Sequence, residues 1–176
     1  MNIQNNKELV IFDRDGTLHQ RNKMGYITNI SKIVLPKDFS YLSNLDSKYF
    51  NLSLVTNQSC VNKEILSYEE VTILNEYLFG LVFQNFDYKI YICPHLESDK
   101  CKCRKPEPGL IIEAMAHFSA TRFNSTFIGD SESDYYAAQN AGIGFIGVCW
   151  DSVCLGSICA HTLTGAIDRL LENRIV

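Results

Sequence analysis

Short apolar runs alternate along the chain with segments in which apolar residues recur at helical spacing. Five runs, each ended by polar or turn-forming residues, are typical of buried strands and cover 9–12, 52–55, 89–92, 126–129 and 144–148. Apolar stripes with a period near 3.6 predict helices over 71–82, 110–118, 134–141 and 163–171. Strands and helices are therefore expected to follow one another in turn.

This alternation predicts an α/β fold in which a parallel sheet of about five strands lies between two layers of helices, in a three-layer, Rossmann-like arrangement. In such sheets, ligands bind beyond the carboxyl ends of the strands. Three predicted strand ends carry polar side chains, namely Asp13, Thr56 and Asp130. A length of 176 residues suits one domain, and we expect that domain to span 1–176 without a linker or a repeat.

Charge and composition argue against two classes of function. The formal net charge is −4 and the Lys and Arg residues are scattered, whereas a nucleic-acid surface needs a basic stripe. No apolar run approaches the roughly 20 residues that cross a bilayer, and residues 1–7 lack the apolar core of a secretory signal. We therefore expect a cytoplasmic monomer that binds neither nucleic acid nor a membrane.

Four carboxylates gather at two of the predicted strand ends: Asp13 and Asp15 at one, and Asp130 and Asp134 at the other. Two carboxylates so close in a turn repel one another without a cation, and the second pair adds to that charge. Hard oxygen ligands suit Mg²⁺, which binds through a few carboxylates and the phosphate of a substrate. Taken singly, Asp-x-Asp-Gly is also an ordinary turn signal, and Asp134 also suits the N-terminus of a helix.

Asp13 and Asp15 could together carry out phosphoryl transfer. If a cation screens Asp13, one of its oxygens can attack phosphorus and form an aspartyl phosphate, which divides one difficult displacement into two easier steps. Asp15 can protonate the leaving alcohol and later deprotonate the attacking water. The phosphoryl oxygens need donors, and the candidates are the Thr56 hydroxyl, the Lys105 ammonium and the backbone N–H groups after Asp13 and Thr56.

A second cluster consists of three cysteines and a histidine, Cys93, His95, Cys101 and Cys103. Three thiolates and an imidazole are the ligand set of a closed tetrahedral zinc site, and four protein ligands leave no position for a reactive water. The alternative is two chance pairs or a redox disulfide. We expect a structural Zn²⁺ in the loop 93–103 that fixes the residues after it.

The candidate residues fall into four motifs. FDRDGTL at 12–18 resembles motif I of the haloacid dehalogenase-like superfamily, and VTNQ at 55–58 resembles motif II. Lys105 within RKP resembles motif III, and GDSESD at 129–134 resembles motif IV. The four motifs occur in the order that the family has.

This resemblance implies a magnesium-dependent phosphatase with an aspartyl-phosphate intermediate. Asp13 is then the nucleophile and Asp15 the acid/base, whereas Thr56 and Lys105 bind the phosphate. Asp13, the Asp15 carbonyl and Asp130 are the implied Mg²⁺ ligands.

The zinc loop is similar to that of the branch that contains heptose bisphosphate phosphatases and histidinol-phosphate phosphatases, which are small enzymes without a large cap domain. The resemblance implies a small phosphorylated metabolite as substrate, with D,D-heptose 1,7-bisphosphate as the first candidate. Histidinol phosphate or another sugar or amino-alcohol phosphate is the alternative. Asn57, Arg104 and Ser131 are the expected substrate contacts.

Two positions depart from that branch, which carries Lys or Arg where this chain has Ser131, and in its heptose members a glycine where this chain has Cys60. The lost cation weakens the case for a doubly phosphorylated substrate. Phosphotransfer to an acceptor other than water remains open, as does a catalytically silent, zinc-stabilised binding domain.

Overall fold

A computed structural model describes residues 7–22, 25–148 and 159–172. Its centre is a six-stranded sheet in the order β3-β2-β1-β4-β5-β6, in which all neighbours run parallel. The strands are β1 (Glu8–Phe12), β2 (Phe50–Asn57), β3 (Tyr88–Cys93), β4 (Ser125–Gly129), β5 (Gly144–Val148) and β6 (Cys159–Ala160). The predicted parallel α/β fold is confirmed.

The expected number of strands, about five, was one too low. The sixth strand, β6, has only two residues and pairs with the end of β5 through Gly147 and Cys159. Two residues are too short for an apolar run or an alternation to be recognised, so hydrophobic patterning could not reveal this strand.

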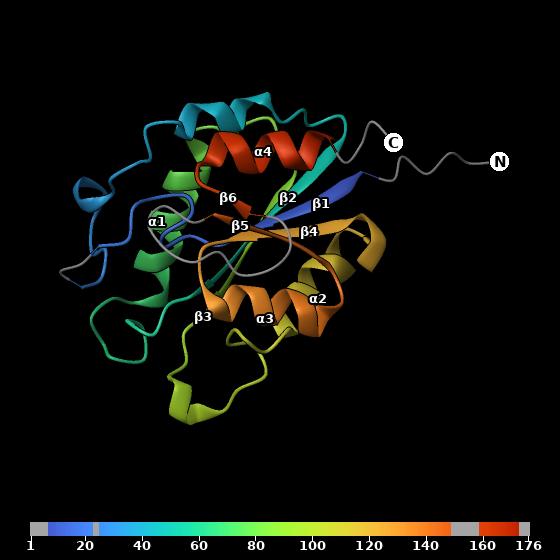
Figure 1. Cartoon of the computed structure of the whole chain (residues 1–176). Helices are drawn as coiled ribbons and strands as arrows, with labels where there is room; N and C mark the ends of the chain where they lie inside the picture. Colours follow the sequence, from blue (N-terminus) through green and yellow to red (C-terminus); the bar gives the residue numbers. More distant parts are fainter. Residues whose placement is uncertain (1–6, 23–24, 149–158, 173–176) are drawn as a thin grey trace.

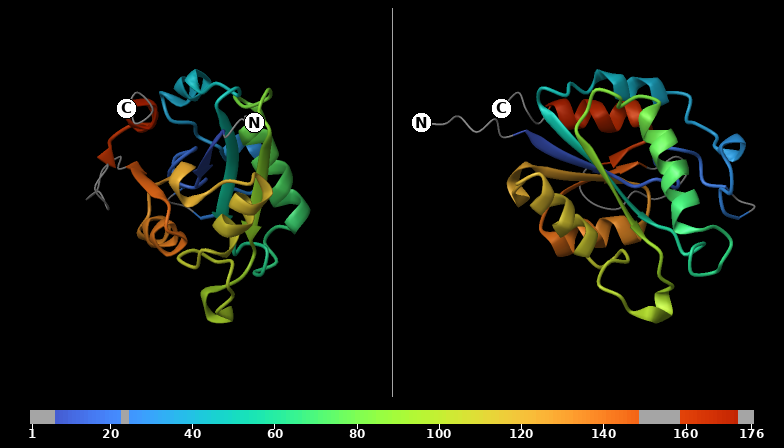
Figure 2. Two further views of the ribbon diagram at one scale, coloured as in Figure 1. Left: turned by 90° about the vertical axis from the view of Figure 1, so that its right-hand side faces the viewer. Right: turned by 180° about the vertical axis from the view of Figure 1, so that it is seen from behind.

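Helices cover both faces of the sheet, as Figures 1 and 2 show. One face packs against α1 (Tyr68–Gly80), α4 (Leu163–Glu172) and the 3₁₀ segment Phe39–Asn44, and the other packs against α2 (Gly109–His117) and α3 (Glu132–Ala141). The molecule therefore has the three layers expected from the sequence.

The residues of β1 alternate between the two apolar cores. Val10 and Phe12 belong to the core under α1 and α4, whereas Leu9 and Ile11 belong to the core under α2 and α3. Successive side chains of a strand point to opposite faces, so a strand covered on both sides reads as a continuous apolar run. That burial holds β1 in the middle of the sheet and fixes the place where the chain leaves it.

No cap domain stands between β1 and β2. The described residues of this connection form only two 3₁₀ segments, Ile30–Lys32 and Phe39–Asn44, and the second inserts Phe39 and Leu42 into the core. The carboxyl edge of the sheet is therefore left open to small molecules. Within the described part of the chain, no helix combines the length and the apolar character that crossing a membrane demands.

Candidate active site

The three central strands end side by side at one edge of the sheet. β1 lies between β2 and β4, and Phe12 is in register with Leu54 on one side and with Ile128 on the other. The chain connections reverse direction here, which is where doubly wound sheets bind their ligands. Residues that follow the three strands must therefore meet.

Asp13, Asp130 and Asp134 meet at this edge, with carboxylate oxygens within 4.8 Å of one another. The Lys105 ammonium lies among them, 2.5 Å from Oδ1 of Asp13 and 2.7 Å from Oδ1 of Asp134. It also donates to the carbonyl of Val55 at 2.9 Å. The sequence had placed these acidic residues and Lys105 in one site, and the structure brings them together.

Burial raises the pKa of Asp13 to about 7; Lys105 lowers it in part, and Asp134, Asp130 and Asp15 add to the rise. Burial opposes the charge on Lys105 as well, but Asp13 and Asp134 raise its pKa above the usual range. Three carboxylates thus share too little positive charge for Asp13 to ionise freely. A hard divalent cation bound by these oxygens would correct this, so the donor set fits Mg²⁺.

Gly16 lets the turn after β1 pass directly against Asp130. Its φ is +96°, and a Cβ atom placed there would lie 2.1 Å from Oδ2 of Asp130. Only glycine combines that backbone conformation with so close an approach. The glycine of motif I therefore lets the two acidic strand ends come together.

The carboxylate of Asp15 is held by three neighbours. Arg14 donates to both of its oxygens at 3.1 and 3.0 Å, Gln58 donates at 2.7 Å, and Nε2 of His19 lies 3.0 Å away. Burial would raise the pKa of Asp15, but the charge of Arg14 and the hydrogen bonds of His19 and Arg14 hold it well below its usual range. In this arrangement Asp15 is ionised.

Arg14 and Gln58 form a buried network that the spacing of residues along the chain does not indicate. Arg14 is 3% exposed and donates to Asn75 on α1 at 3.0 Å and to Gln58 at 2.9 Å. Gln58 also donates to the Thr56 hydroxyl at 2.8 Å, which leaves the proton of that hydroxyl free to be donated. Through Asn75, α1 therefore helps to hold the Arg14 side chain in place beside Asp15.

Ser131, which was expected to contact the substrate, is the N-cap residue of α3. Its hydroxyl accepts from the Asp134 N–H at 3.3 Å and its N–H donates to Oδ2 of Asp134 at 3.0 Å, which forms a capping box. The hydroxyl also donates to Oδ2 of Asp134 at 2.7 Å. Asp134 is therefore both a helix N-terminal carboxylate and a partner of Lys105. Ser131 also lines the pocket that contains Asp13, although these hydrogen bonds occupy its hydroxyl.

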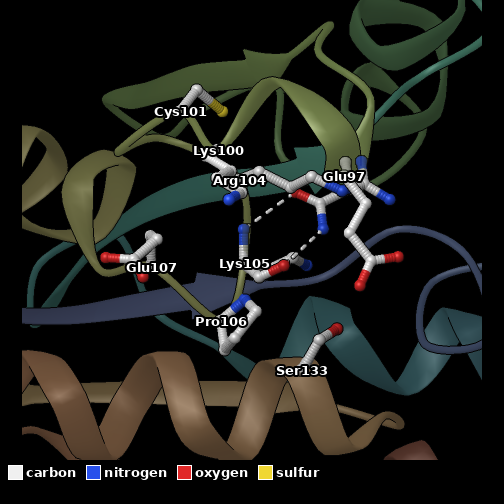
Figure 3. Close-up of a pocket in the computed structure, with 9 residues that line it drawn as sticks. Glu97, Lys100, Cys101, Arg104, Lys105, Pro106, Glu107 and Ser133 are labelled. Carbon is white, nitrogen blue, oxygen red and sulfur yellow. Dashed lines mark hydrogen bonds between the residues drawn. The ribbon is translucent and has the colours of Figure 1, made fainter.

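Two pockets open at this edge of the sheet. One, of about 530 Å³, contains Asp13, and Arg21 and Tyr26 stand in its wall. The other, of about 520 Å³, lies towards the cysteine-rich loop and includes Glu97 and Glu107 (Figure 3). The pockets share Asn57, Arg104, Lys105 and Ser133 as lining residues.

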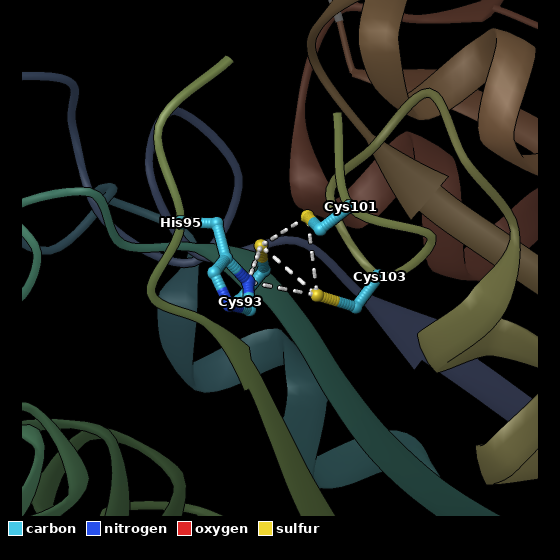
Figure 4. A group of neighbouring side chains, drawn as sticks. All are labelled: Cys93, His95, Cys101 and Cys103. Carbon is cyan, nitrogen blue, oxygen red and sulfur yellow. Dashed lines mark hydrogen bonds between the residues drawn. The ribbon is translucent and has the colours of Figure 1, made fainter. Parts of the chain in front are cut away.

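The four predicted zinc ligands converge at the end of β3, where Cys93 is the last residue of the strand (Figure 4). Their sulfur atoms are 3.4 to 3.7 Å apart, and Nδ1 of His95 lies 3.2 Å from the sulfur of Cys103 and 3.6 Å from that of Cys93. A disulfide needs about 2.05 Å between sulfurs. A tetrahedral zinc with bonds of about 2.3 Å places them about 3.8 Å apart, so the cluster is compatible with Zn²⁺.

Arg104 follows this cluster and is tied to it. Its guanidinium donates to the carbonyl of His95 at 3.1 Å, and its side chain borders both pockets. The loop thus positions the arginine that was expected to contact the substrate.

Comparison with known proteins agrees with this geometry. Residues 33–148 match the family described as haloacid dehalogenase-like hydrolase. A D-glycero-beta-D-manno-heptose-1,7-bisphosphate 7-phosphatase of Helicobacter pylori is 32% identical over 79% of this chain and 82% of its own length. The histidine biosynthesis bifunctional protein HisB of Campylobacter jejuni is also 32% identical, over 78% of this chain but only 40% of that protein.

Solved structures support the fold. The D,D-heptose 1,7-bisphosphate phosphatase of B. bronchiseptica, in complex with magnesium and phosphate, superposes with a TM-score of 0.82 at 22% identity and covers 94% of this chain and 99% of that one. The chain therefore belongs to the haloacid dehalogenase-like hydrolases, in the branch that contains the heptose bisphosphate phosphatases and HisB.

Proposed function

We propose that this chain is a magnesium-dependent phosphomonoesterase, formed by 1–176 as a single domain, that hydrolyses a small phosphorylated metabolite with Asp13 as nucleophile. The observation that carries the proposal is the position of Asp13, which is 5% exposed, contacts the Lys105 ammonium and lies beside Asp130 and Asp134. A turn aspartate without a function would not need such an environment.

Asp13, the carbonyl of Asp15 and Asp130 would hold the Mg²⁺ ion. When bound, the ion supplies positive charge that screens Asp13 from the phosphate and favours its ionised form. Lys105 and the Thr56 hydroxyl then meet the charge on the phosphoryl oxygens. Both groups are buried, so their interactions with phosphate are little weakened by water.

In the first step, an Asp13 oxygen forms a bond to phosphorus while the bond from phosphorus to the alcohol oxygen breaks, and Asp15 gives its proton to that oxygen. In the second step, Asp15 takes a proton from water, whose oxygen bonds to phosphorus and releases Asp13. Asp15 must be protonated for the first step. Its contacts to Arg14, Gln58 and His19 therefore have to loosen when the substrate binds.

The cysteine cluster would hold a structural Zn²⁺. Cys93, His95, Cys101 and Cys103 supply four ligands, and the last ligand stands two residues before Lys105. The ion would thus position Lys105 and Arg104 without contact with the substrate.

The first candidate substrate is D,D-heptose 1,7-bisphosphate, on the strength of the Helicobacter pylori relative. Arg104 would contact the part of the substrate away from the scissile phosphate, and Asn57 and Ser131 would border it. Histidinol phosphate is the second candidate. It is favoured by the HisB relatives. A substrate with a single phosphate also needs less positive charge than a bisphosphate, which agrees with a hydroxyl instead of a cation at Ser131.

A screen of phosphorylated sugars, amino alcohols and histidinol phosphate with Mg²⁺ tests the proposal. We expect phosphate release that stops in Asp13→Asn and persists in Asp87→Asn, which changes an exposed aspartate away from the site. Release that survives Asp13→Asn, or that does not depend on Mg²⁺, would overturn the mechanism. Product analysis in the presence of alcohols separates hydrolysis from phosphotransfer, and a chain inactive on every substrate would favour a binding domain.

A further inference from the structure

The side chain of Arg21 reaches into the acidic cluster from the segment after motif I. Its Nη2 atom lies 2.9 Å from Oδ2 and 3.1 Å from Oδ1 of Asp130, and it donates to the carbonyl of Asp15 at 3.2 Å. A single nitrogen thus contacts both oxygens of a carboxylate and a backbone carbonyl. The three oxygens converge on one positively charged atom.

These oxygens belong to two of the three groups that we propose as Mg²⁺ ligands, so the inference rests on the proposed function. Both oxygens of Asp130 are engaged by Arg21. A cation held by the Asp130 carboxylate and the Asp15 carbonyl would come close to Nη2 of Arg21, and the two positive charges would repel one another. Arg21 and the ion would therefore compete for these ligands.

The charge of the cluster and the exposure of Arg21 both favour replacement of Arg21 by Mg²⁺ at Asp130. Among the residues that the structure describes, two cations pair with Asp13, Asp130 and Asp134, namely Lys105 and Arg21. If Mg²⁺ replaces Arg21, three negative charges face three positive ones, and the cluster is neutral. The Arg21 side chain is 60% exposed while that of Asp130 is 15% exposed, so the arginine can move into water more readily than the carboxylate can.

We propose that Arg21 is an internal competitor of the divalent cation: it occupies the cation's position in the metal-free protein and must be displaced before the metal binds. Displacement leaves a guanidinium at the mouth of the pocket that contains Asp13, where Arg104 is already present. The arrival of the metal thereby adds a mobile cation to the entrance through which an anionic substrate must pass. A guanidinium suits that role because its planar donors match phosphate oxygens.

Calorimetric titration of the metal-free protein with Mg²⁺, without substrate, tests this competition. Arg21→Ala should bind Mg²⁺ more tightly than the unaltered protein by at least about threefold, because a competitor reduces apparent affinity by the fraction of protein that it blocks. The matched control is Arg122→Ala, which removes the same charge from an exposed arginine stacked on Phe123. Equal tightening in both variants would reduce the effect to net charge and overturn the inference.

Added guanidinium chloride, against sodium chloride at equal ionic strength, provides a second arm. It should weaken Mg²⁺ binding to Arg21→Ala, where the position is free, and leave the unaltered protein nearly unchanged. If the two proteins respond alike, Arg21 does not occupy the cation's position.

A nitrogen NMR spectrum of the arginine side chains follows the exchange in the unaltered protein, with the Arg21 signal assigned by its absence in Arg21→Ala. We expect this signal to move as Mg²⁺ is added, and an unmoved signal under saturating Mg²⁺ contradicts displacement. If neither the unaltered protein nor Arg21→Ala binds Mg²⁺, the proposed function fails as well. If both bind it equally, only the role of Arg21 fails.

Discussion

The side chain of Asn57 pairs with the backbone of Lys105 through two hydrogen bonds. Lys105 N–H donates to Oδ1 of Asn57 at 3.1 Å, and Nδ2 of Asn57 donates to the Lys105 carbonyl at 3.1 Å. The last residue of β2 thus holds the residue whose ammonium contacts Asp13. Asn57 was expected to contact the substrate; it borders the pocket, but its amide is used to fix Lys105.

Asn57→Ala should therefore lower activity by misplacing Lys105. Each lost hydrogen bond contributes about 1 kcal/mol, so we expect kcat/KM to fall by about tenfold or more. Steady-state kinetics at saturating Mg²⁺ measures the loss. Asn85→Ala, at an exposed position, is the matched control and should keep full activity. Full activity in Asn57→Ala would mean that the zinc loop alone positions Lys105.

Loss of the zinc ion should also misplace Lys105, because the last zinc ligand stands two residues before it. Cys101→Ser removes one of four ligands, and we expect the purified variant to lose its zinc and at least about tenfold in kcat, because a displacement of about 1 Å can cost far more. Metal analysis and kinetics in excess Mg²⁺ give the two readouts. Cys60→Ser changes a buried cysteine outside the cluster and should retain the zinc. A zinc-free Cys101→Ser protein with unchanged turnover would refute the structural role.

Much of the site could be predicted because its residues follow strands that are themselves easy to recognise. Leu9 to Phe12 is apolar throughout since both faces of β1 are covered, and the parallel order then brings Asp13 beside Asp130. The cysteine cluster lies within one loop, so spacing alone indicated it. Asp134 carries a local signal as well, because Ser131 and Asp134 have the spacing of a capping box.

The contacts that could not be predicted join residues far apart in the chain through polar side chains. Arg14 meets Asn75 across 61 positions, and Arg21 meets Asp130 across 109. Asn75 lies on the buried side of α1, where an apolar stripe offers no reason to expect a partner for arginine. Such pairs depend on how the helices and loops pack against the sheet, and the spacing of apolar residues does not determine that packing.

The Arg14–Asn75 contact should contribute to stability. Asn75→Ala removes the acceptor of Nη1 from a guanidinium that is almost fully buried, and leaving a buried donor unpaired costs about 1–3 kcal/mol. We expect a lower free energy of unfolding in urea. Asn85→Ala again serves as the exposed control. An unchanged denaturation midpoint would show that Gln58 and Asp15 alone satisfy Arg14.

Gly16 and Gly80 offer a matched pair of substitutions. Gly16→Ala forces a Cβ atom against the Asp130 carboxylate in a backbone conformation that alanine rarely adopts, whereas a Cβ atom at Gly80 meets no atom within 4 Å. The strain at Gly16 is of the order of 1–3 kcal/mol, and shifting Asp130 should lower kcat by about 100-fold.

Gly80→Ala, at the end of α1, should keep its activity and change the free energy of unfolding by no more than about 1 kcal/mol. Urea denaturation of both variants separates loss of fold from loss of site, because a folded Gly16→Ala protein that no longer binds Mg²⁺ would trace the defect to Asp130. Equal turnover in the two variants would show that the close approach of Gly16 to Asp130 is not required for the reaction.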